Sequence, residues 1–447
     1  MEDQILELIN ADHIQVVKLY SVFAGMNAAD IAEIFQKVDR KKAVQIFRLL
    51  PKGMAADVFA YIEPEEQQVI VESLTDNEVS DIINKLFVDD AVDLIEEMPA
   101  DVVNRVLQKV NAEKRKTINQ ILQYPEDSAG SIMTTEYVEL RKDDTVAEAF
   151  AHIRSTGIKK ETIYTSYVIG KGRLLVGVVT AKDLMLANPE DTIGEIMDAN
   201  FATAATTDDQ EAVTALFRKY SLLALPVTDK DQHLVGIITV DDAVEVIDEE
   251  NTEDFEKMAA LTPSEEPYLK TNILKLTRNR IIWLMVLMIS ATFTGSIIAG
   301  FEDMLTVIPA LIVFIPMIMD TGGNAGSQTS TLIIRGMALG EIQIGDILRV
   351  LARELCIALL CGLGLGVVNH IRIFFMYGKS NRLSFTVSAA LVITVMIAKT
   401  IGCILPMVAK KFRVDPAIMA APLITTIVDG TSLAVYFFIA KSLFNLG

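Results

Sequence analysis

Asp429 lies in the middle of the last long apolar run of the sequence, roughly thirteen residues after that run begins. A carboxylate at such a depth in a membrane is costly, and residues of this kind usually face the interior of a helix bundle or a watery path. Polar residues and one proline recur at helical spacing and predict a stripe along one helix face: Pro422, Thr425, Thr426, Asp429 and Ser432. The stripe could bind a cation, and a carboxylate that only holds helices together is the alternative.

A second polar stretch, from Gly322 to Thr331, interrupts another apolar run. Its three glycines allow backbones to approach closely, while Asn324 and Gln328 offer side-chain oxygens to a hydrated ion. Small polar residues also pack helices together, which is the alternative interpretation. Oxygen ligands with few carboxylates suit magnesium, which prefers octahedral coordination and loses its water reluctantly. The residues discriminate only weakly against manganese and cobalt.

Asp415 precedes Pro416 immediately before the last apolar run, beside several basic residues. Its carboxylate could collect ions at the inner mouth of a pathway. The same pair of residues is equally typical of a helix N-cap followed by proline at the first helical position, and both roles can coexist.

Lys399 lies near the middle of the fourth apolar run, where an ammonium group needs a partner or must reach water. Asp320 and Glu354 are the candidate partners. We interpret Lys399 as half of a structural pair rather than as part of an ion path.

Two groups of acidic residues mark the polar part of the chain. The first contains Asp89, Asp90 and Asp93, and the second fills nine of the sixteen positions from 241 to 256 on a predicted amphipathic helix. Acids from separate segments repel one another unless cations neutralise them, so cation binding could select between compact and open states. Solvated surface charge is the alternative. The second group includes Asp242, Glu245, Glu250, Glu253 and Asp254.

The composition separates two unlike regions, because a hydrophobic content of 51% coexists with a net charge of −19. Long apolar runs predict five membrane spans, at about 281–300, 306–333, 355–376, 384–408 and 416–442. The acidic N-terminus lacks the pattern of a secretory signal, and basic residues are enriched on the flanks predicted to lie inside. We therefore expect the first 270 residues in the cytoplasm. Their acidity argues against nucleic acid as a partner.

Two repeats organise the polar region. Short amphipathic helices recur from Met26 to Val110 and predict a stacked, all-α array. A second repeat of mixed strand and helix character matches 176–183 with 235–242 and resembles a tandem of CBS domains. That resemblance implies an adenine nucleotide such as ATP at the paired threonines and aspartates, Thr180 with Asp183 and Thr239 with Asp242. We favour magnesium over nucleotide at Asp242.

The order of helical repeats, CBS pair, acidic helix and five spans resembles the MgtE family of magnesium channels over almost the whole chain. The stretches 322–328 and 422–429 carry the most specific similarity. The resemblance implies a homodimer whose pore, lined by the second and fifth spans, binds magnesium between two copies of Asp429. It also implies a linker "plug" helix and acidic sensor sites that close the pore at high cytosolic magnesium. With Thr425 added from the polar stripe, the expected pore ligands are Asn324, Thr425, Asp415 and Asp429, and the expected regulatory ligands are Asp89, Asp90, Asp93, Asp242, Glu245, Glu250, Glu253 and Asp254.

We predict a multidomain membrane protein with an α-helical superhelical N-terminal domain (1–128), two α/β CBS domains (129–190 and 191–250), a linker helix (251–275) and a transmembrane domain of five helices (276–447). Its predicted activity is passive magnesium influx across the cell membrane, driven by an inside-negative potential, without catalysis. No nucleotide-hydrolysing phosphate loop occurs in the sequence. Two alternatives stay open: a channel or exchanger for another divalent cation such as Mn²⁺ or Co²⁺, and a nucleotide sensor anchored in the membrane.

Overall fold

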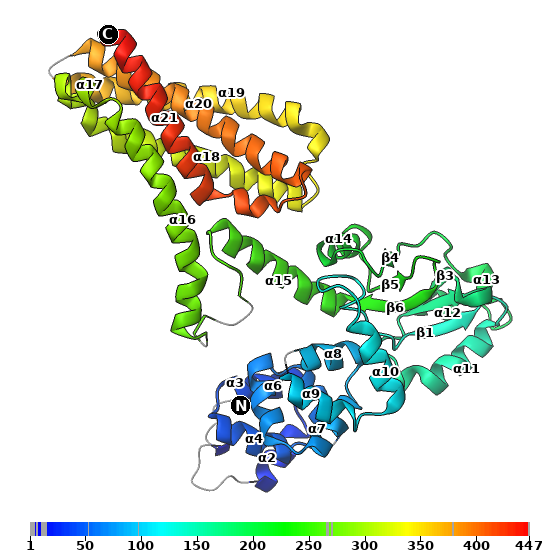
Figure 1. Cartoon of the computed structure of the whole chain (residues 1–447). Coiled ribbons are helices and arrows are strands. Elements are labelled where there is room, and N and C mark those ends of the chain that lie inside the picture. The colour runs from blue at the N-terminus through cyan, green and yellow to red at the C-terminus, as the bar shows by residue number, and fades with distance from the viewer. Residues whose placement is uncertain are drawn as a thin grey trace. The chain divides into compact units, whose positions relative to one another are not determined.

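The computed structural model describes residues 16–51, 53–96, 98–264, 268–269, 271–377 and 380–445, together with Ile5, Leu8 and Ile9. The chain divides into two compact units, Met1–Ile247 and Asp248–Gly447. Figure 1 colours the first unit from blue to green and the second from green to red. Each unit buries hydrophobic clusters of its own, so each fold follows from packing within that unit.

Short helices form the first part of unit 1. Each packs against the helix two places along the chain, as α2 does with α4 and α4 with α6, which builds a stacked array. Phe35, Phe47 and Phe59 meet edge to face in its core, with ring centroids 6.3 and 5.6 Å apart. The predicted array of amphipathic helices is confirmed. The helices are α2 (Val16–Phe23), α3 (Ala28–Gln36), α4 (Arg40–Leu49), α5 (Ala55–Ala60), α6 (Pro64–Ser73), α7 (Asp76–Ile83), α8 (Val88–Glu96), α9 (Ala100–Leu107) and α10 (Ala112–Ile121).

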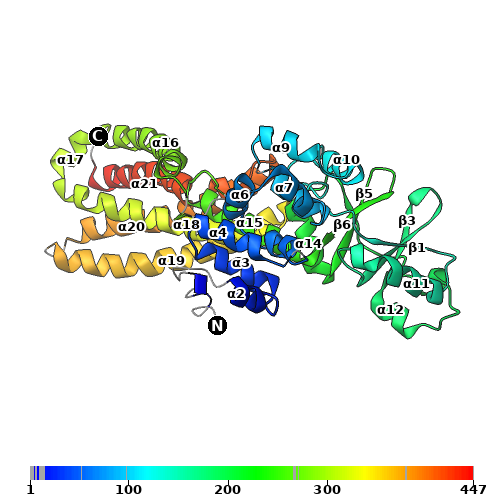
Figure 2. The same ribbon diagram turned by 90° about the horizontal axis from the view of Figure 1, so that it is seen from below.

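Two α/β modules of the same design follow. In each, a first strand pairs parallel with a second, which pairs antiparallel with a third. The first module contains β1 (Val138–Arg141), α11 (Val146–Thr156), β2 (Thr165–Ile169), β3 (Leu175–Thr180) and α12 (Ala181–Leu186). Helix α13 (Ile193–Ile196) follows in the chain and packs against β1 and β3 of the first module. The second module contains β4 (Ala204–Ala205), α14 (Gln210–Tyr220), β5 (Ala224–Thr228) and β6 (Leu234–Thr239). The predicted repeat of strand and helix is confirmed, and Figure 2 shows both modules from a second side.

The sequence repeat also pairs a Val-Gly step in the third strand of each module (176–177 and 235–236) with an Ile-Met step elsewhere (196–197 and 132–133), and the glycines explain why. A Cβ added to Gly177 would lie 2.6 Å from the sulfur of Met197, and one added to Gly236 would overlap the sulfur of Met133. The missing side chain therefore lets a methionine from outside the hairpin pack against the third strand. Beside it, Thr134 exchanges two backbone hydrogen bonds with Ile237, of 2.8 and 2.9 Å.

The acidic helix α15 (Val240–Met258) starts directly after β6 and is 19 residues long. This confirms the predicted amphipathic helix. The linker helix expected over 251–275 differs, because residues 251–258 are the second half of α15 and the helix does not continue. Ala260 has a φ of 55°, which a helix does not tolerate, and Pro263 follows. Residues 265–267 and 270 of the expected linker lie outside the described residues.

Five long helices form most of unit 2: α16 (Ile273–Ala299), α18 (Ile315–Ala338), α19 (Ile347–Met376), α20 (Asn381–Lys411) and α21 (Ala421–Phe444). Short elements connect them, including α17 (Glu302–Val307), η3 (Pro309–Phe314), η4 (Ile344–Asp346) and η5 (Pro416–Met419). By length and composition, four segments among the described residues could cross a membrane: 273–299, 344–376, 381–411 and 416–444.

Helix α18 is the predicted span whose boundaries differ most from the prediction, and it is not among these four segments. It was expected from 306 but begins at Ile315, because Pro309 and Pro316 start a 3₁₀ segment and then the helix. Its 24 residues span about 36 Å at 1.5 Å per residue, enough to cross a bilayer. The polar stretch makes α18 less apolar than the other long helices. It packs against α20 and α21, which places that stretch inside the helical bundle.

Candidate functional site

The polar stretch of α18 lies against the polar stripe of α21. A Cβ on Gly323 would lie 2.8 Å from Cγ2 of Thr425, and a Cβ on Gly322 would lie 3.0 Å from Oγ of Ser432. The glycines therefore allow α21 to approach the backbone of α18 within one helical turn of Asp429. The second and fifth long helices thus form a contact that larger side chains would prevent.

Asp429 is half-buried on α21, and the side chain of Asn324 on α18 is exposed in the single chain. The hydroxyls of Thr425 and Thr426 donate to the carbonyl of Pro422 over 2.9 and 3.0 Å. Their protons are thereby directed along the helix, and their oxygens keep lone pairs for a cation.

Asp320 is a functional candidate that the sequence interpretation missed as a companion of Asp429. Its carboxylate is exposed and close enough to Asp429 for the two negative charges to repel each other. Two such carboxylates attract a divalent cation more strongly than one. The available signal was its position, two residues before Gly322 on the same helix.

Lys399 forms a buried network with Thr329 and Glu354. Its ammonium donates to Oγ1 of Thr329 over 3.1 Å, and that hydroxyl donates to Oε2 of Glu354 over 2.9 Å. The ammonium lies 3.8 Å from the same carboxylate oxygen, and all three side chains are buried. The predicted structural pairing of Lys399 is confirmed with Glu354 as the partner. The network joins α18, α19 and α20.

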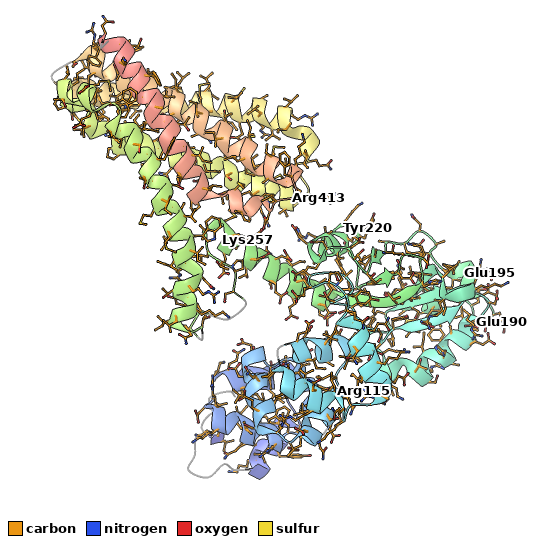
Figure 3. All side chains as sticks on the ribbon, viewed as in Figure 1. Arg115, Glu190, Glu195, Tyr220, Lys257 and Arg413 are labelled. Atoms are coloured by element: carbon orange, nitrogen blue, oxygen red, sulfur yellow. The ribbon has the colours of Figure 1, made fainter. Side chains whose placement is uncertain are left out.

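Asp415 caps the 3₁₀ segment η5 before α21. Its Oδ1 accepts from the backbone N–H of Ala417 over 2.8 Å, which confirms the N-cap interpretation. The other oxygen, Oδ2, lies 2.7 Å from the ammonium of Lys257, which is also 2.6 Å from Oε1 of Glu253. Lys257 lies near the end of α15 (Figure 3). Burial lowers the pKa of Lys257, but hydrogen bonds to Asp415 and Glu253 outweigh it and raise the pKa above its usual value.

A second acidic group lies within unit 1. Asp89 and Asp90 are in the first turn of α8, and Asp242 is in the first turn of α15. Burial and then the charge of Asp242 raise the pKa of Asp89 well above its usual range. The same two causes raise the pKa of Asp90 to about 6. These shifts indicate that acids from separate segments repel one another here, as the sequence suggested.

The remaining predicted regulatory residues surround this group or lie farther along α15. Asp93 is exposed and is repelled by Asp90 and Glu245. Burial, followed by the charge of Asp242, raises the pKa of Glu245. Glu250 and Asp254 are half-buried in the part of α15 that belongs to unit 2.

Glu161 is the main acidic residue that the sequence interpretation missed in unit 1. Burial, and then repulsion from Asp242 and Asp90, raises the pKa of Glu161 to about 8. Its Oε2 is buried and has no hydrogen-bond partner among the described residues.

Two further charged residues lie close to Glu161 and the acidic group. Glu136 adds a further negative charge and accepts from Thr134 over 2.8 Å. Lys114, also close, carries positive charge beside Asp89. No local pattern marked Glu161, because it lies in a connection and not in an acidic run.

The predicted nucleotide residues act as helix caps. Oγ1 of Thr180 donates to Asp183 over 2.5 Å, and the amide of Asp183 donates back to Thr180 over 3.2 Å. Oγ1 of Thr239 donates to Oδ2 of Asp242 over 2.5 Å, and the backbone N–H of Thr239 donates to the same oxygen over 3.2 Å. Asp242 therefore accepts hydrogen bonds at the start of α15 while its charge acts on the acidic group of unit 1.

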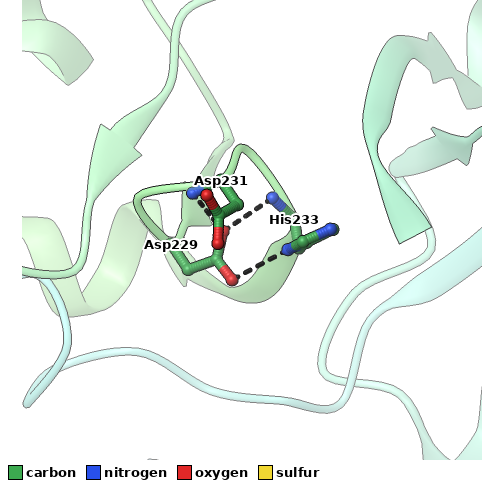
Figure 4. Close-up of side chains that lie close together, drawn as sticks. All are labelled: Asp229, Asp231 and His233. Atoms are coloured by element: carbon green, nitrogen blue, oxygen red, sulfur yellow. Dashed lines mark hydrogen bonds and ion pairs between the residues drawn. The ribbon is translucent and has the colours of Figure 1, made fainter. Parts of the chain in front are cut away.

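Asp229, Asp231 and His233 converge in the turn between β5 and β6, with one ligand atom from each within 4.8 Å of the others (Figure 4). Nδ1 of His233 lies 2.9 Å from Oδ2 of Asp229, whose Oδ1 accepts two backbone N–H groups of the turn over 2.9 Å each. These bonds stabilise the turn, in which Gln232 has a φ of 65°. The exposed group therefore has a sufficient structural explanation.

Known protein families match most of the chain. Residues 26–127 match the MgtE intracellular N domain, 129–190 and 193–249 match CBS domains, and 315–439 match the MgtE divalent cation transporter domain. The chain is 33% identical over 430 residues to the magnesium transporter MgtE of Thermus thermophilus, with 95% of each chain covered. The chain belongs to the MgtE family. A magnesium transporter MgtE of Bacillus subtilis is 33% identical over 422 residues, with 94% of this chain and 93% of that one covered.

Two solved structures resemble the polar part of this MgtE-family chain. The soluble part of a magnesium transporter is 30% identical with a TM-score of 0.52, covering 56% of this chain and 97% of that one. The cytosolic domain of the Mg²⁺ channel MgtE in complex with ATP is also 30% identical with a TM-score of 0.52, covering 55% and 100%. Together with the apolar helices, the family places this chain among multi-pass membrane ion transporters, which are not an enzyme class.

Proposed function

We propose that this MgtE-family chain conducts magnesium passively into the cell and that cytosolic magnesium closes the pathway. The observation that carries the proposal is the contact between the glycines of α18 and the polar stripe of α21, one turn from Asp429. A carboxylate in an otherwise apolar helix, with amide and hydroxyl oxygens nearby, suits an ion that binds largely hydrated.

Two copies of the chain would form the pore. In a homodimer in the cell membrane, two copies of Asp429 and of Asn324 would provide a symmetric ring of oxygens, with Thr425 beside them. The exposure of Asn324 and Asp320 in the single chain favours a further surface that covers them. With the N-terminus in the cytoplasm, an inside-negative potential favours entry of a divalent ion by about 4.6 kcal/mol per 100 mV.

Closure would come from the acidic groups. Asp89, Asp90, Asp242 and Glu161 repel one another within unit 1, and a divalent cation among them would remove that repulsion. Asp93 and Glu245 would bind at its exposed side. Glu250, Glu253 and Asp254, along the rest of α15, would bind further ions toward Asp415. The cation is expected to stabilise one arrangement of the soluble unit and thereby to bias the gate.

ATP is a proposed modulator of the CBS pair, since the related cytosolic domain was crystallised with it. Thr180 and Asp183 are the better candidates for that site. Asp242 lies within the acidic group, where a nucleotide phosphate would add negative charge to carboxylates that already repel one another. Nucleotide at the first module and magnesium at Asp242 are therefore compatible.

Flux through the purified full chain in liposomes tests the pore assignment. Magnesium uptake is expected in the native protein and is expected to be lost in Asp429→Asn, whereas Asp303→Asn removes an exposed acid on α17 and should leave it unchanged. Equal magnesium uptake by Asp429→Asn and the native chain would refute the role of Asp429. Uptake of manganese or cobalt without magnesium would favour another divalent cation, and no uptake of any ion would favour a membrane-anchored nucleotide sensor.

A further inference from the structure

Lys257 occupies the position that a bound cation would take between two predicted metal ligands. Its ammonium lies 2.6 Å from Oε1 of Glu253 and 2.7 Å from Oδ2 of Asp415. The Lys257 side chain is 20% exposed, against 40% for Glu253 and 30% for Asp415, so the ammonium is the most enclosed of the three groups.

The two carboxylates are positioned by different parts of unit 2. Glu253 is one turn before Lys257 on α15, whereas Asp415 is held at the start of η5 by its cap bond to Ala417. Because Oδ1 of Asp415 accepts that bond, Oδ2 is the oxygen directed at Lys257. The ammonium therefore ties the end of α15 to the segment that leads into α21, a link between elements 158 positions apart by residue number (415 − 257).

A divalent cation could not join the same two oxygens while Lys257 is there. Magnesium binds carboxylate oxygens at about 2.0–2.1 Å, so it would need the space between them that the ammonium fills. With Lys257 present, the three side chains carry a formal net charge of −1, and without it the carboxylates carry −2. The lysine thus acts both as a link and as a competitor.

We propose that the Lys257 ammonium is a tethered cation that holds α15 to the Asp415 turn when magnesium is low and competes with magnesium for Glu253 and Asp415. The proposal rests on the gating function proposed above and adds a competitor to it. At low magnesium the lysine would maintain part of the closed arrangement. At high magnesium the divalent ion would displace it and hold the same carboxylates more firmly.

The test measures magnesium flux through the full chain in liposomes as the magnesium concentration at the cytoplasmic face is varied. Lys257→Met should raise flux at low magnesium, because the link is lost. The pathway of this variant should also close at a magnesium concentration about fivefold lower than that of the native chain. The reason is that magnesium no longer competes with a lysine whose ion pairs, being partly exposed, contribute about 1 kcal/mol. Lys257→Arg, which keeps the positive charge, should restore the native flux at low magnesium.

Glu253→Gln distinguishes competition from an ordinary structural ion pair. This substitution breaks the same link but also removes a magnesium ligand. The pathway of the Glu253→Gln chain should therefore close at a higher magnesium concentration than the native one, whereas that of Lys257→Met should close at a lower concentration. Lys230→Met, which removes an exposed lysine of the β5–β6 turn, is the matched control and should leave the closing curve unchanged.

Three results would overturn the proposal. If magnesium flux depends on the cytoplasmic magnesium concentration in the same way in the native, Lys257→Met and Lys230→Met chains, the role of Lys257 alone would be refuted. Shifts to higher magnesium in both Lys257→Met and Glu253→Gln would reduce the contact to a structural ion pair. A native chain that conducts magnesium but never closes would refute the gating function and this inference with it.

Discussion

Removing one charge of the Glu354–Lys399 pair is expected to destabilise unit 2 more than removing both. The ammonium and carboxylate lie 3.8 Å apart, and Lys399 and Glu354 are only 7% and 9% exposed. At an effective dielectric constant of about 20, their attraction is about 4 kcal/mol. Either single neutralisation leaves the other charge buried without its partner, which costs roughly 3–5 kcal/mol in comparable sites.

A double-mutant cycle measures this coupling. The free energy of unfolding would be compared in one detergent for the native chain, Glu354→Gln, Lys399→Met and the double variant. We expect a coupling of roughly 2–3 kcal/mol, because the double variant has no unpaired charge. Arg349 and Asp346 provide the control pair, since they lie 3.5 Å apart but with 88% and 34% of the side chain exposed, and their coupling should stay below about 1 kcal/mol. Additivity of the Glu354 and Lys399 variants within about 0.5 kcal/mol would refute the reasoning.

Three further predictions concern the acidic group and the glycine contacts. Burial raises the pKa of Glu161 from 4.5 to about 8, so between these pH values the folded state keeps a proton that the unfolded chain has released. The melting temperature of magnesium-free protein should therefore decrease as the pH is raised from about 4.5 to about 8. The fall should be smaller in Glu161→Gln, and a melting temperature that rises over this range would contradict the assignment. Asp242→Asn should lose magnesium-dependent protection from protease and the exposed Asp143→Asn should keep it; full protection in both would rule out cation binding at Asp242. Gly402→Ala should cost roughly 1–3 kcal/mol in thermal unfolding, because its Cβ would overlap a carbonyl oxygen of α18. Gly364→Ala, with nothing within 4 Å, should be neutral or stabilising by up to about 1 kcal/mol, and equal effects of the two would argue against a close approach of α18 and α20.

Repeated packing requirements made much of the fold predictable. A methionine side chain packs against Gly177 in one module and against Gly236 in the other, so both positions require a glycine. The repeat in the sequence therefore corresponds to a repeat in the structure. The short amphipathic helices and the long apolar helices likewise carry their periodicity in the sequence. The start of α18 was less predictable, because the apolar residues before Ile315 form a 3₁₀ segment instead of an α-helix. Hydropathy alone does not distinguish these two conformations.

Partners from distant segments were the part that local patterns could not supply. Burial indicated that Lys399 needs a carboxylate, but the choice of Glu354 over Asp320 depends on how α18, α19 and α20 pack. Glu161 joined the acidic group only through the packing of the CBS module against the helical array. Asp429 could be selected as a candidate from the sequence alone, since a single carboxylate in an apolar run is already unusual.

Three lysines show how the surroundings decide what an ammonium does beside carboxylates. Lys399 is enclosed with both Thr329 and Glu354, so replacing it with a mobile ion would require unpacking three helices. Lys114 donates to the carbonyl of Leu86 and faces a whole group of acids, so its single positive charge only partly neutralises that group. Lys257 is different, because it is partly exposed, its carboxylate partners come from two elements, and we propose that both partners also bind magnesium. Exchange with magnesium is therefore most accessible at Lys257, which is why its variants, and not those of Lys399, should change the magnesium concentration at which the pathway closes.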